Sequence, residues 1–417
     1  MSLPIVTVTR FLFVVFYIYA FINKRKSINL KSFNIKNVPM EYRFLAAYFI
    51  LRIISNLYYV TTYGQAIKTI FVIVFEQLLF MIAFCMLDPS KEETEKLIRI
   101  IVGVATVLFV TGIFESITSI RPFDALFTVS RELINMHFER LGLLRATTTM
   151  IAPAIYGNMC LYMLPFILYL YETTRLKRYI AILGLAVLAI IHSGSRSDMF
   201  FLVATLLVYV VFVLKDKERR LHFCKNATVV TGVLFLYICI ASIFFTNLRY
   251  FYVGNAKAIL NEVGFDFDLD EGAPEGVEGY GNNHNGSASR TRQLTGLYYT
   301  ATINPIFGLG SGAQRRGDVK YAWRSKKTGN ITWNVVNSYD LVIVEMFCDE
   351  GLLGLLAICS LLYYMFRQSK GNRFYRLAFF CYMLSSLSTG NLYAFLFMYL
   401  TVFAAHNKYF KSIEYKT

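Results

Sequence analysis

The sequence has 417 residues, of which 56% are hydrophobic and 17% charged, and its mean hydropathy is +0.48. Soluble domains carry about 25% charged residues, so this composition excludes an ordinary soluble protein and favours one embedded in a bilayer. The net charge of +15 does not indicate nucleic-acid binding, because the basic residues gather in short loops between apolar runs, where they set membrane orientation.

Many apolar runs approach the ~20 residues that cross a bilayer core. Backbone polar groups must be satisfied internally there, and the alternation of a membrane barrel is absent, so the runs should be helices. The sequence therefore predicts an all-α, polytopic transmembrane protein with about 11 spans, in a range of roughly 10–12. The expected spans are 5–22, 43–61, 67–87, 97–117, 150–171, 179–192, 197–214, 227–245, 339–366, 377–390 and 391–407. Two of them, 179–192 and 377–390, are short and could be half-helices.

The basic loops give the orientation of these spans. With this map, the lysine- and arginine-rich loops and the C-terminal tail all fall on one side, which is then cytoplasmic. The N-terminus and three segments, 118–149, 193–197 and 246–338, are expected outside. We therefore divide the chain into N-terminal transmembrane helices (1–245), an extracytoplasmic loop that carries short helices (246–338), and C-terminal transmembrane helices (339–417).

Neither a disulfide framework nor a metal site is expected. The seven cysteines include no CxxC pair and no Cys/His spacing typical of zinc. The acidic stretch Asp266–Asp270 departs from the calcium-loop pattern, because glycine comes one place late and the twelfth residue is Val277.

Arginine is frequent in the segments expected outside. Arginine is always charged and binds phosphate through a planar fork, so a cluster at a membrane surface suits a pyrophosphate group. The alternative is that each arginine snorkels or binds ordinary lipid phosphate. The arginines that we select as candidates are Arg140, Arg145, Arg196, Arg290 and Arg292.

The segment Ser193-Gly194-Ser195-Arg196 interrupts two apolar runs. Such a break at membrane depth is tolerated where it lines a protein cavity, and an arginine there is a functional candidate. The alternative is a simple outer turn between two spans.

Two acids stand near the end of the long loop. Asp340 is expected in the first turn of an apolar helix, where Asn337 or Ser338 could cap the helix and the helix dipole favours an acid. The alternative, functional interpretation is that Asp340 is a general base beside arginines. Glu345 lies deeper and needs a partner, for which an outward arginine is the obvious candidate. Four aromatic residues of the loop could stack on sugars or pack locally: Tyr298, Tyr299, Trp323 and Trp333.

Four short motifs together resemble the O-antigen polymerases (Wzy) and the related O-antigen ligases. They are Arg145–Thr149 followed by Pro153 and Gly157; His192–Arg196; Arg292 followed by Pro305–Gly310; and Asp340 followed by Glu350–Gly354. In the ligases a histidine stands eleven residues before the glycine that matches Gly351. Here that position is Asp340, which favours polymerase.

The resemblance implies a bacterial inner-membrane enzyme that transfers a nascent glycan from undecaprenyl pyrophosphate to a new lipid-linked repeat unit at the periplasmic face. For this transfer Asp340 is the candidate base, and Arg292, Arg196 and Arg145 are the candidate phosphate clamp, supported by Arg290 and Arg140. Glu345 is a further candidate for substrate binding. No cofactor or metal is needed, because the pyrophosphate bond supplies the driving force. Expected partners are the lipid-linked oligosaccharide, membrane lipids, a chain-length regulator and a flippase, but no nucleic acid. The alternatives are an O-antigen ligase that acts on lipid A core, or a flippase; a transporter should show paired repeats.

Overall fold

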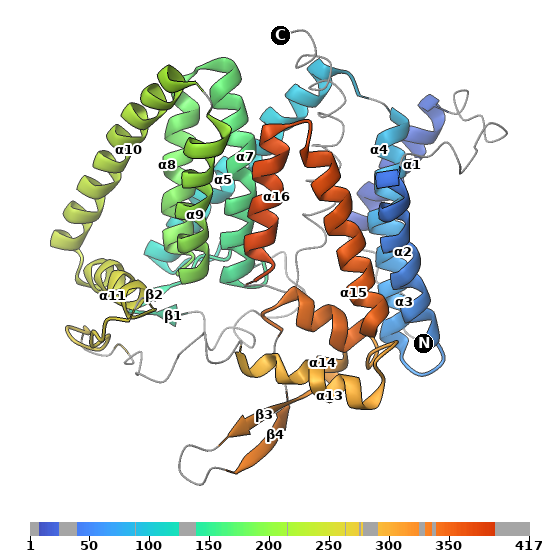
Figure 1. Ribbon diagram of the computed structural model, residues 1–417. Coiled ribbons are helices and arrows are strands. Elements are labelled where there is room, and N and C mark those ends of the chain that lie inside the picture. Colours follow the sequence, from blue (N-terminus) through green and yellow to red (C-terminus); the bar gives the residue numbers. More distant parts are fainter. Residues whose placement is uncertain are drawn as a thin grey trace. The chain divides into compact units, whose positions relative to one another are not determined.

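The computed structural model describes residues 8–24, 40–87, 89–124, 139–214, 216–262, 264–274, 277, 291–324, 330–335 and 339–387, and these are mostly helical (Figure 1). Five helical segments are long and apolar enough to cross a membrane: Gly64–Phe84, Lys91–Thr118, Pro153–Thr174, Arg196–Val213 and Lys217–Phe244. The prediction of a helical, multi-pass membrane protein is therefore confirmed. The expected span 391–407 lies outside the described residues.

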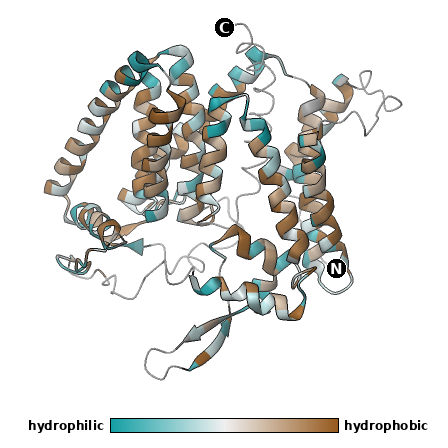
Figure 2. Ribbon diagram, viewed as in Figure 1, coloured by the Kyte–Doolittle hydropathy of each residue, from teal (hydrophilic) through white to brown (hydrophobic). Residues whose placement is uncertain are grey.

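Apolar side chains cover the outside of several helices as well as their packed faces. On α10 (Lys217–Phe244), Val229, Val233, Phe235 and Leu236 are each about 60% exposed or more. Figure 2 shows hydrophobic residues along the long helices, with hydrophilic residues towards helix ends and turns. Apolar surface of this extent has no counterpart on soluble monomers, and lipid is its natural solvent.

The chain forms two compact units. The first contains Met1–Glu95, Gly286–Phe379 and Ser386–Thr417, and the second contains Lys96–Asn285 and Phe380–Ser385.

The first unit starts with α1 (Val8–Lys24) and α2 (Met40–Tyr58). A continuous helical segment follows, made of α3 (Gly64–Phe71), the π-helical turn η4 (Val72–Leu78) and α4 (Leu79–Leu87). Arg10 of α1 forms an ion pair with Glu76 of η4 at 2.7 Å. Later in the chain come α13 (Thr295–Ile303), α14 (Ala313–Arg316), the antiparallel strands β3 (Lys320–Arg324) and β4 (Ile331–Val335), and α15 (Val342–Ser369). Helix α16 (Arg373–Ser385) begins in this unit, and its last residues, Phe380–Ser385, belong to the second unit.

Helix α15 packs along α2 (Figure 1) and contains a sharp break. Gly351 has φ 66° and ψ −151°, which are not helical values. The expected continuous span 339–366 is therefore two helical pieces, and the helix starts at Val342, later than expected.

The second unit is built around α7 (Pro153–Thr174), whose side chains are almost all buried. Around it lie α5 (Lys91–Thr118), α8 (Lys177–His192), α9 (Arg196–Val208) with the π-helical turn η6 (Tyr209–Val213), α10 and α11 (Thr246–Glu262). A short ribbon of β1 (Glu139–Arg140) and β2 (Leu143–Leu144) precedes α7. Helix α5 begins with a capping box: Ser90 N donates to Glu93 Oε2, and Glu93 N donates to Ser90 Oγ.

Candidate functional site

The turn between α8 and α9 is held by two of the candidate arginines. Arg145 Nε donates to Ser193 O at 2.8 Å, and Arg140 Nη1 donates to Gly194 O at 2.7 Å. Gly194 has φ 60°, and a Cβ there would lie 3.1 Å from Arg145 Cγ and Nε. Glycine is therefore required both by backbone conformation and by the close approach of an arginine. Arg196 is the first residue of α9 and is half-buried, so three candidate arginines gather around this turn.

A buried histidine connects this turn to α11. His192 is fully buried, and its ring nitrogens share hydrogen bonds with Ser116 Oγ at 3.0 Å and Tyr252 Oη at 2.9 Å. Burial raises the pKa of the Tyr252 hydroxyl above its ordinary value, so this group stays protonated and able to donate. The end of α5, the α8–α9 turn and α11 therefore lie at the same end of this unit, as the span map requires.

A buried glutamate fixes the segment that follows Arg145. Glu115, in the last turn of α5, accepts hydrogen bonds from Thr147 Oγ1 and from the main-chain N–H of Thr148, both at 2.7 Å. Arg121 Nε lies 3.8 Å from the same carboxylate. The threonines of the Arg145–Thr149 motif thus anchor the chain to α5, and this places Arg145 at the turn.

In the first unit, the motifs Pro305–Gly310 and Glu350–Gly354 are joined by main-chain hydrogen bonds, and we call this contact the joint. Leu309 N donates to Cys348 O, and Gly310 N donates to Asp349 O, at 2.8 and 2.9 Å. From the other side, Leu352 N donates to Pro305 O at 2.8 Å. These bonds close Pro305–Gly310 onto the break in α15.

Two glycines make this joint possible. A Cβ on Gly351 would lie 2.4 Å from Gly308 N and from Ile306 O, and a Cβ on Gly308 would lie 2.6 Å from Gly351 N. Both glycines also have positive φ, at 66° and 71°. Any side chain at either position would collide with main chain, so the two backbones need glycine to come this close.

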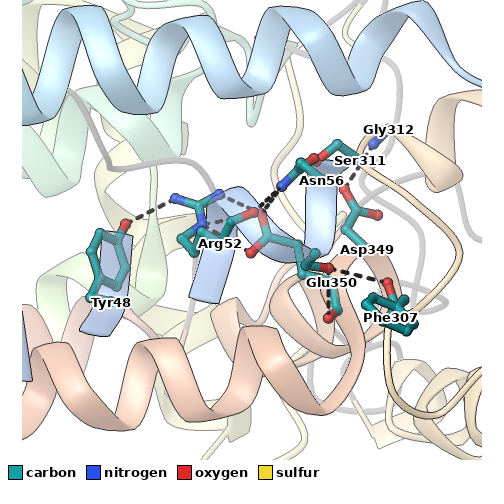
Figure 3. Close-up of polar contacts among 9 residues, drawn as sticks. Tyr48, Arg52, Asn56, Phe307, Ser311, Gly312, Asp349 and Glu350 are labelled. Atoms are coloured by element: carbon teal, nitrogen blue, oxygen red, sulfur yellow. Dashed lines mark hydrogen bonds and ion pairs between the residues drawn. The ribbon is translucent and has the colours of Figure 1, made fainter. Parts of the chain in front are cut away.

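A buried ion pair stabilises the joint from α2 (Figure 3). Arg52 donates to the carboxylate of Glu350 through Nε and Nη2, the closest distance being 2.7 Å from Nη2 to Oε1. The two side chains are 6% and 2% exposed. Arg52 Nη1 donates to Tyr48 Oη, and Asn56 Nδ2 donates to Glu350 Oε1.

The same network reaches the glycine loop Gly308–Gly312. Ser311 Oγ donates to Asn56 Oδ1 at 2.7 Å, and Gly312 N donates to Asp349 Oδ2 at 2.9 Å. Arg316 donates to the carbonyl oxygens of Leu309, Gly310 and Ser311 and to Asp318 Oδ2. The loop is therefore fixed along its length, and Arg316 has a structural part in fixing it.

We expect Arg52→Ala to lower stability strongly. Removing one partner of a buried, hydrogen-bonded pair leaves the other charge uncompensated, which typically costs about 3–5 kcal/mol. The measurement is the thermal stability and steady-state amount of the purified membrane protein. Lys91→Ala is the matched control, because the Lys91–Glu95 pair is 49% and 25% exposed and surface pairs of this kind contribute about 0–1 kcal/mol. Equal loss in both variants would contradict a special role for Arg52.

Asp340 has a different position from the one expected. Its helix begins at Val342, with Leu341 as N-cap, so Asp340 stands directly before the N-cap residue and not inside the first turn. Instead Gln293 holds it by two bonds: Gln293 Nε2 donates to Asp340 Oδ2 at 3.0 Å, and Asp340 N donates to Gln293 Oε1 at 2.9 Å. Gln293 is buried and Asp340 is half-buried. The proposed caps Asn337 and Ser338 lie outside the described residues.

Arg292 is the neighbour of Gln293 in the chain. Its guanidinium carbon lies 3.7 Å from the ring centroid of Trp323, a cation–π stack that fixes the plane of the fork. Thr295 Oγ1 donates to Arg292 O and accepts from Ala322 N, which joins the start of α13 to β3. Gln293, which binds Asp340, therefore follows directly after Arg292 in the chain. Arg290 lies outside the described residues.

Glu345 lies one helical turn beyond Val342, in an acidic environment. Its Oε2 is buried with no hydrogen-bond partner among the described residues. The charges that act on it come from Asp349 and Glu350 on the same helix and from Arg52 and Arg315. Arg315 is an exposed arginine of the long loop, the kind of partner that the sequence predicted for this acid.

Several residues of these networks were not predicted from the sequence. Arg52 and Glu115 are charged residues inside apolar runs, a signal that marks functional or structural sites in membranes and that could have found them. Gln293 carried no such signal, because a lone glutamine in a polar loop is ordinary. The candidate arginines at the α8–α9 turn belong to the second unit, whereas Arg292, Asp340 and Glu345 belong to the first.

Comparison with known proteins supports the resemblance noted in the sequence. Residues 181–359 match the family Wzy_C, described as O-antigen ligase. The match includes the α8–α9 turn, the long loop and the break in α15. This family covers membrane enzymes of the O-antigen ligase and polymerase type. No curated protein matches the chain significantly.

Proposed function

We propose that the chain polymerises lipid-linked polysaccharide repeat units, a proposal supported by the match of residues 181–359 to the family described as O-antigen ligase. A hydroxyl of the sugar at the non-reducing end of one unit attacks the anomeric carbon of another chain. The new glycosidic bond forms as the bond from that carbon to undecaprenyl pyrophosphate breaks. The hydroxyl proton passes to a base on the protein, and lipid pyrophosphate leaves.

The arrangement of Asp340 and Arg292 is the observation that carries this proposal. Asp340 is oriented by two hydrogen bonds to Gln293, so its carboxylate suits a general base. Arg292, the chain neighbour of Gln293, is held flat by Trp323 and presents a fork suited to phosphate. A base and a cation for the leaving group are the two things that this transfer needs.

The remaining candidates are proposed to bind the substrate. Arg145, Arg196, Arg140 and Arg290 would hold pyrophosphate or sugar, and Glu345 would bind sugar hydroxyls. At the α8–α9 turn, Arg145 and Arg140 each use part of the guanidinium on a carbonyl group, and a guanidinium has five N–H donors. The carbonyl bonds orient the two guanidinium groups at the α8–α9 turn.

No cofactor or metal is needed in this reaction, because the activated pyrophosphate bond provides the driving force and fixed arginines can take the place of a cation. We place the enzyme in the bacterial inner membrane, with its active site facing the periplasm. A flippase that supplies the lipid-linked unit and a chain-length regulator are the proposed partners.

A ligase is the second candidate, and the description of the matched family supports it. Asp340 stands where the related ligases carry histidine, eleven residues before Gly351, and this difference favours polymerase. The lipopolysaccharide ladder of a strain that lacks the gene distinguishes the two. Loss of the ladder with one repeat unit kept on the core supports polymerase. Loss of every repeat, with lipid-linked polymer accumulating, supports ligase.

We further propose eleven spans, with 246–338 outside and 215–226 inside, because basic residues crowd the latter segment. Single cysteines at Ser289 and Asn226 in a cysteine-free variant test this topology. A membrane-impermeant thiol reagent should label Ser289→Cys in intact spheroplasts, and Asn226→Cys only after the membrane is opened. Labelling of Ser289→Cys from the cytoplasm alone would overturn the map.

A further inference from the structure

Both tryptophans of the chain lie on the β3–β4 hairpin, and both are exposed. The sequence contains two tryptophans, Trp323 on β3 and Trp333 on β4, which are 37% and 43% exposed. In membrane proteins tryptophan is usually placed in the belts at the bilayer surface. A hairpin in a long outward loop is a different location, and it suggests that these rings contact something other than the protein itself.

The strand register shows which side chains share a face. Ala322 pairs with Trp333, and Lys320 pairs with Val335. Directly opposed residues point to the same side of an antiparallel ribbon, so Trp333, Val335 and Lys320 share one face, together with Ile331 two residues before Trp333. Ile331, Trp333 and Val335 are 63%, 43% and 41% exposed. We call this set the Trp333 face.

Helix α13 makes the Trp333 face rigid without covering it. Tyr299 of α13 lies with its ring centroid 5.5 Å from that of Trp333, at an interplanar angle of 42°. On the other face of the hairpin, Arg292 stacks on Trp323. Each tryptophan is therefore fixed by one neighbour while part of its ring remains accessible.

The surroundings of the Trp333 face are basic. Among the described residues of 291–335 whose side chains are placed, the cations are Arg292, Arg315, Arg316 and Lys320. The single acid among them, Asp318, is bound to Arg316 at 2.6 Å. The surface thus combines a flat aromatic ring with an excess of positive charge, which complements a ligand that has apolar ring faces and negative charge.

The direction of the hairpin favours a ligand in solution over a lipid surface. Figure 1 shows β3 and β4 extending beyond the ends of α2 and α15 and away from these helices, within the same unit. A lipid-binding hairpin would turn back along the helices towards the bilayer surface.

We propose that the Trp333 face binds an acidic sugar chain, by stacking a sugar ring on Trp333 and pairing its negative groups with Lys320. The proposal rests on the proposed polymerase function, in which this ligand is the growing polymer. Trp323 contacts Arg292, and Arg292 is next to the residue that orients Asp340. The polymer bound to the hairpin would therefore be held beside the proposed catalytic residues between successive additions.

Tryptophan fluorescence gives a direct test, because the hairpin holds both tryptophans of the chain. In the full-length Trp323→Phe variant in neutral-lipid nanodiscs, all tryptophan emission comes from Trp333. We expect polyuronate oligosaccharides to change this emission saturably, and dextran oligosaccharides of equal length to have little effect. Equal responses to both probes, or no response to polyuronate, would overturn the proposal. So would a response only to added anionic phospholipid vesicles, which would assign the face to a membrane.

Matched variants test the two parts of the contact. Binding of a dye-labelled polyuronate, followed by anisotropy, should weaken about tenfold in Trp333→Ala and several-fold in Lys320→Glu. Asn334→Ala is the control, because Asn334 is exposed and points to the opposite face; it should bind within about twofold of the native protein. Equal loss in all three variants would indicate a damaged hairpin and contradict the assigned face. The assay needs no turnover, so its failure is separate from failure of the polymerase proposal.

Discussion

Asp340→Asn is expected to lower turnover of lipid-linked repeat units in membranes by about 10²–10⁴-fold, the usual effect of removing a positioned general base. Protein abundance should stay normal. An asparagine oxygen can still accept from Gln293 Nε2, and the bond from the main-chain N–H of residue 340 to Gln293 Oε1 is unchanged. The substitution therefore removes proton acceptance and keeps the geometry.

Two further measurements separate catalysis from structure at this position. A base works only when deprotonated, so activity that depends on Asp340 should fall at acid pH. The pH profile of the residual activity of the asparagine variant should lack this acid-side fall. Gln293→Ala should cause an intermediate loss, because the carboxylate is retained but no longer oriented. If Asp340→Asn keeps activity within about threefold of the native protein, Asp340 is not the base.

The long apolar helices could be predicted from the sequence, because hydropathy is a local property; five described helices are long and apolar enough to cross a membrane. The runs that became α7 and α10 needed no knowledge of their neighbours. Helix ends depend on finer detail: Asp340 was expected inside the first turn, whereas Leu341 has extended backbone and the helix starts at Val342. Boundary errors of this size are usual for hydropathy patterns, but here one residue of shift changes what an acid can do.

The pairing of motifs could not be predicted, because it depends on contacts between distant parts of the chain. Arg52 and Glu350 are 298 residues apart in sequence, and nothing local marks them as partners. In the sequence, Gly351 looks like any glycine in an apolar helix. Only the structure shows that Gly308 lies so close to it that neither position can carry a side chain. Sequence patterns selected these segments as candidates, and the fold shows that Pro305–Gly310 packs against the break at Gly351.

Arg292→Ala is the second change expected to have a large effect on activity. Loss of one preorganised group that stabilises developing charge typically costs about 10²–10³-fold in rate, and Arg292 is proposed to stabilise the leaving pyrophosphate. Arg292→Lys should also be impaired, because an ammonium group cannot reproduce the planar fork or its stack. Turnover per amount of protein is the measurement. Lys257→Ala is a suitable control, since Lys257 is a cation of the segment proposed to face outward and is already paired with Glu271 at 2.6 Å.

Substitution of Trp323 tests whether the orientation of the Arg292 guanidinium matters in addition to its charge. The guanidinium lies over the Trp323 ring at 3.7 Å, and a stack of this kind is worth on the order of 0.5–1 kcal/mol at an exposed site. Trp323→Ala should therefore reduce turnover several-fold, and Trp323→Phe, which keeps a ring face, should restore most of it. Two results would contradict bidentate binding of pyrophosphate by Arg292. One is native activity in Arg292→Lys; the other is an unchanged turnover in Trp323→Ala when Arg292→Ala is impaired. Either would mean that the positive charge alone is sufficient.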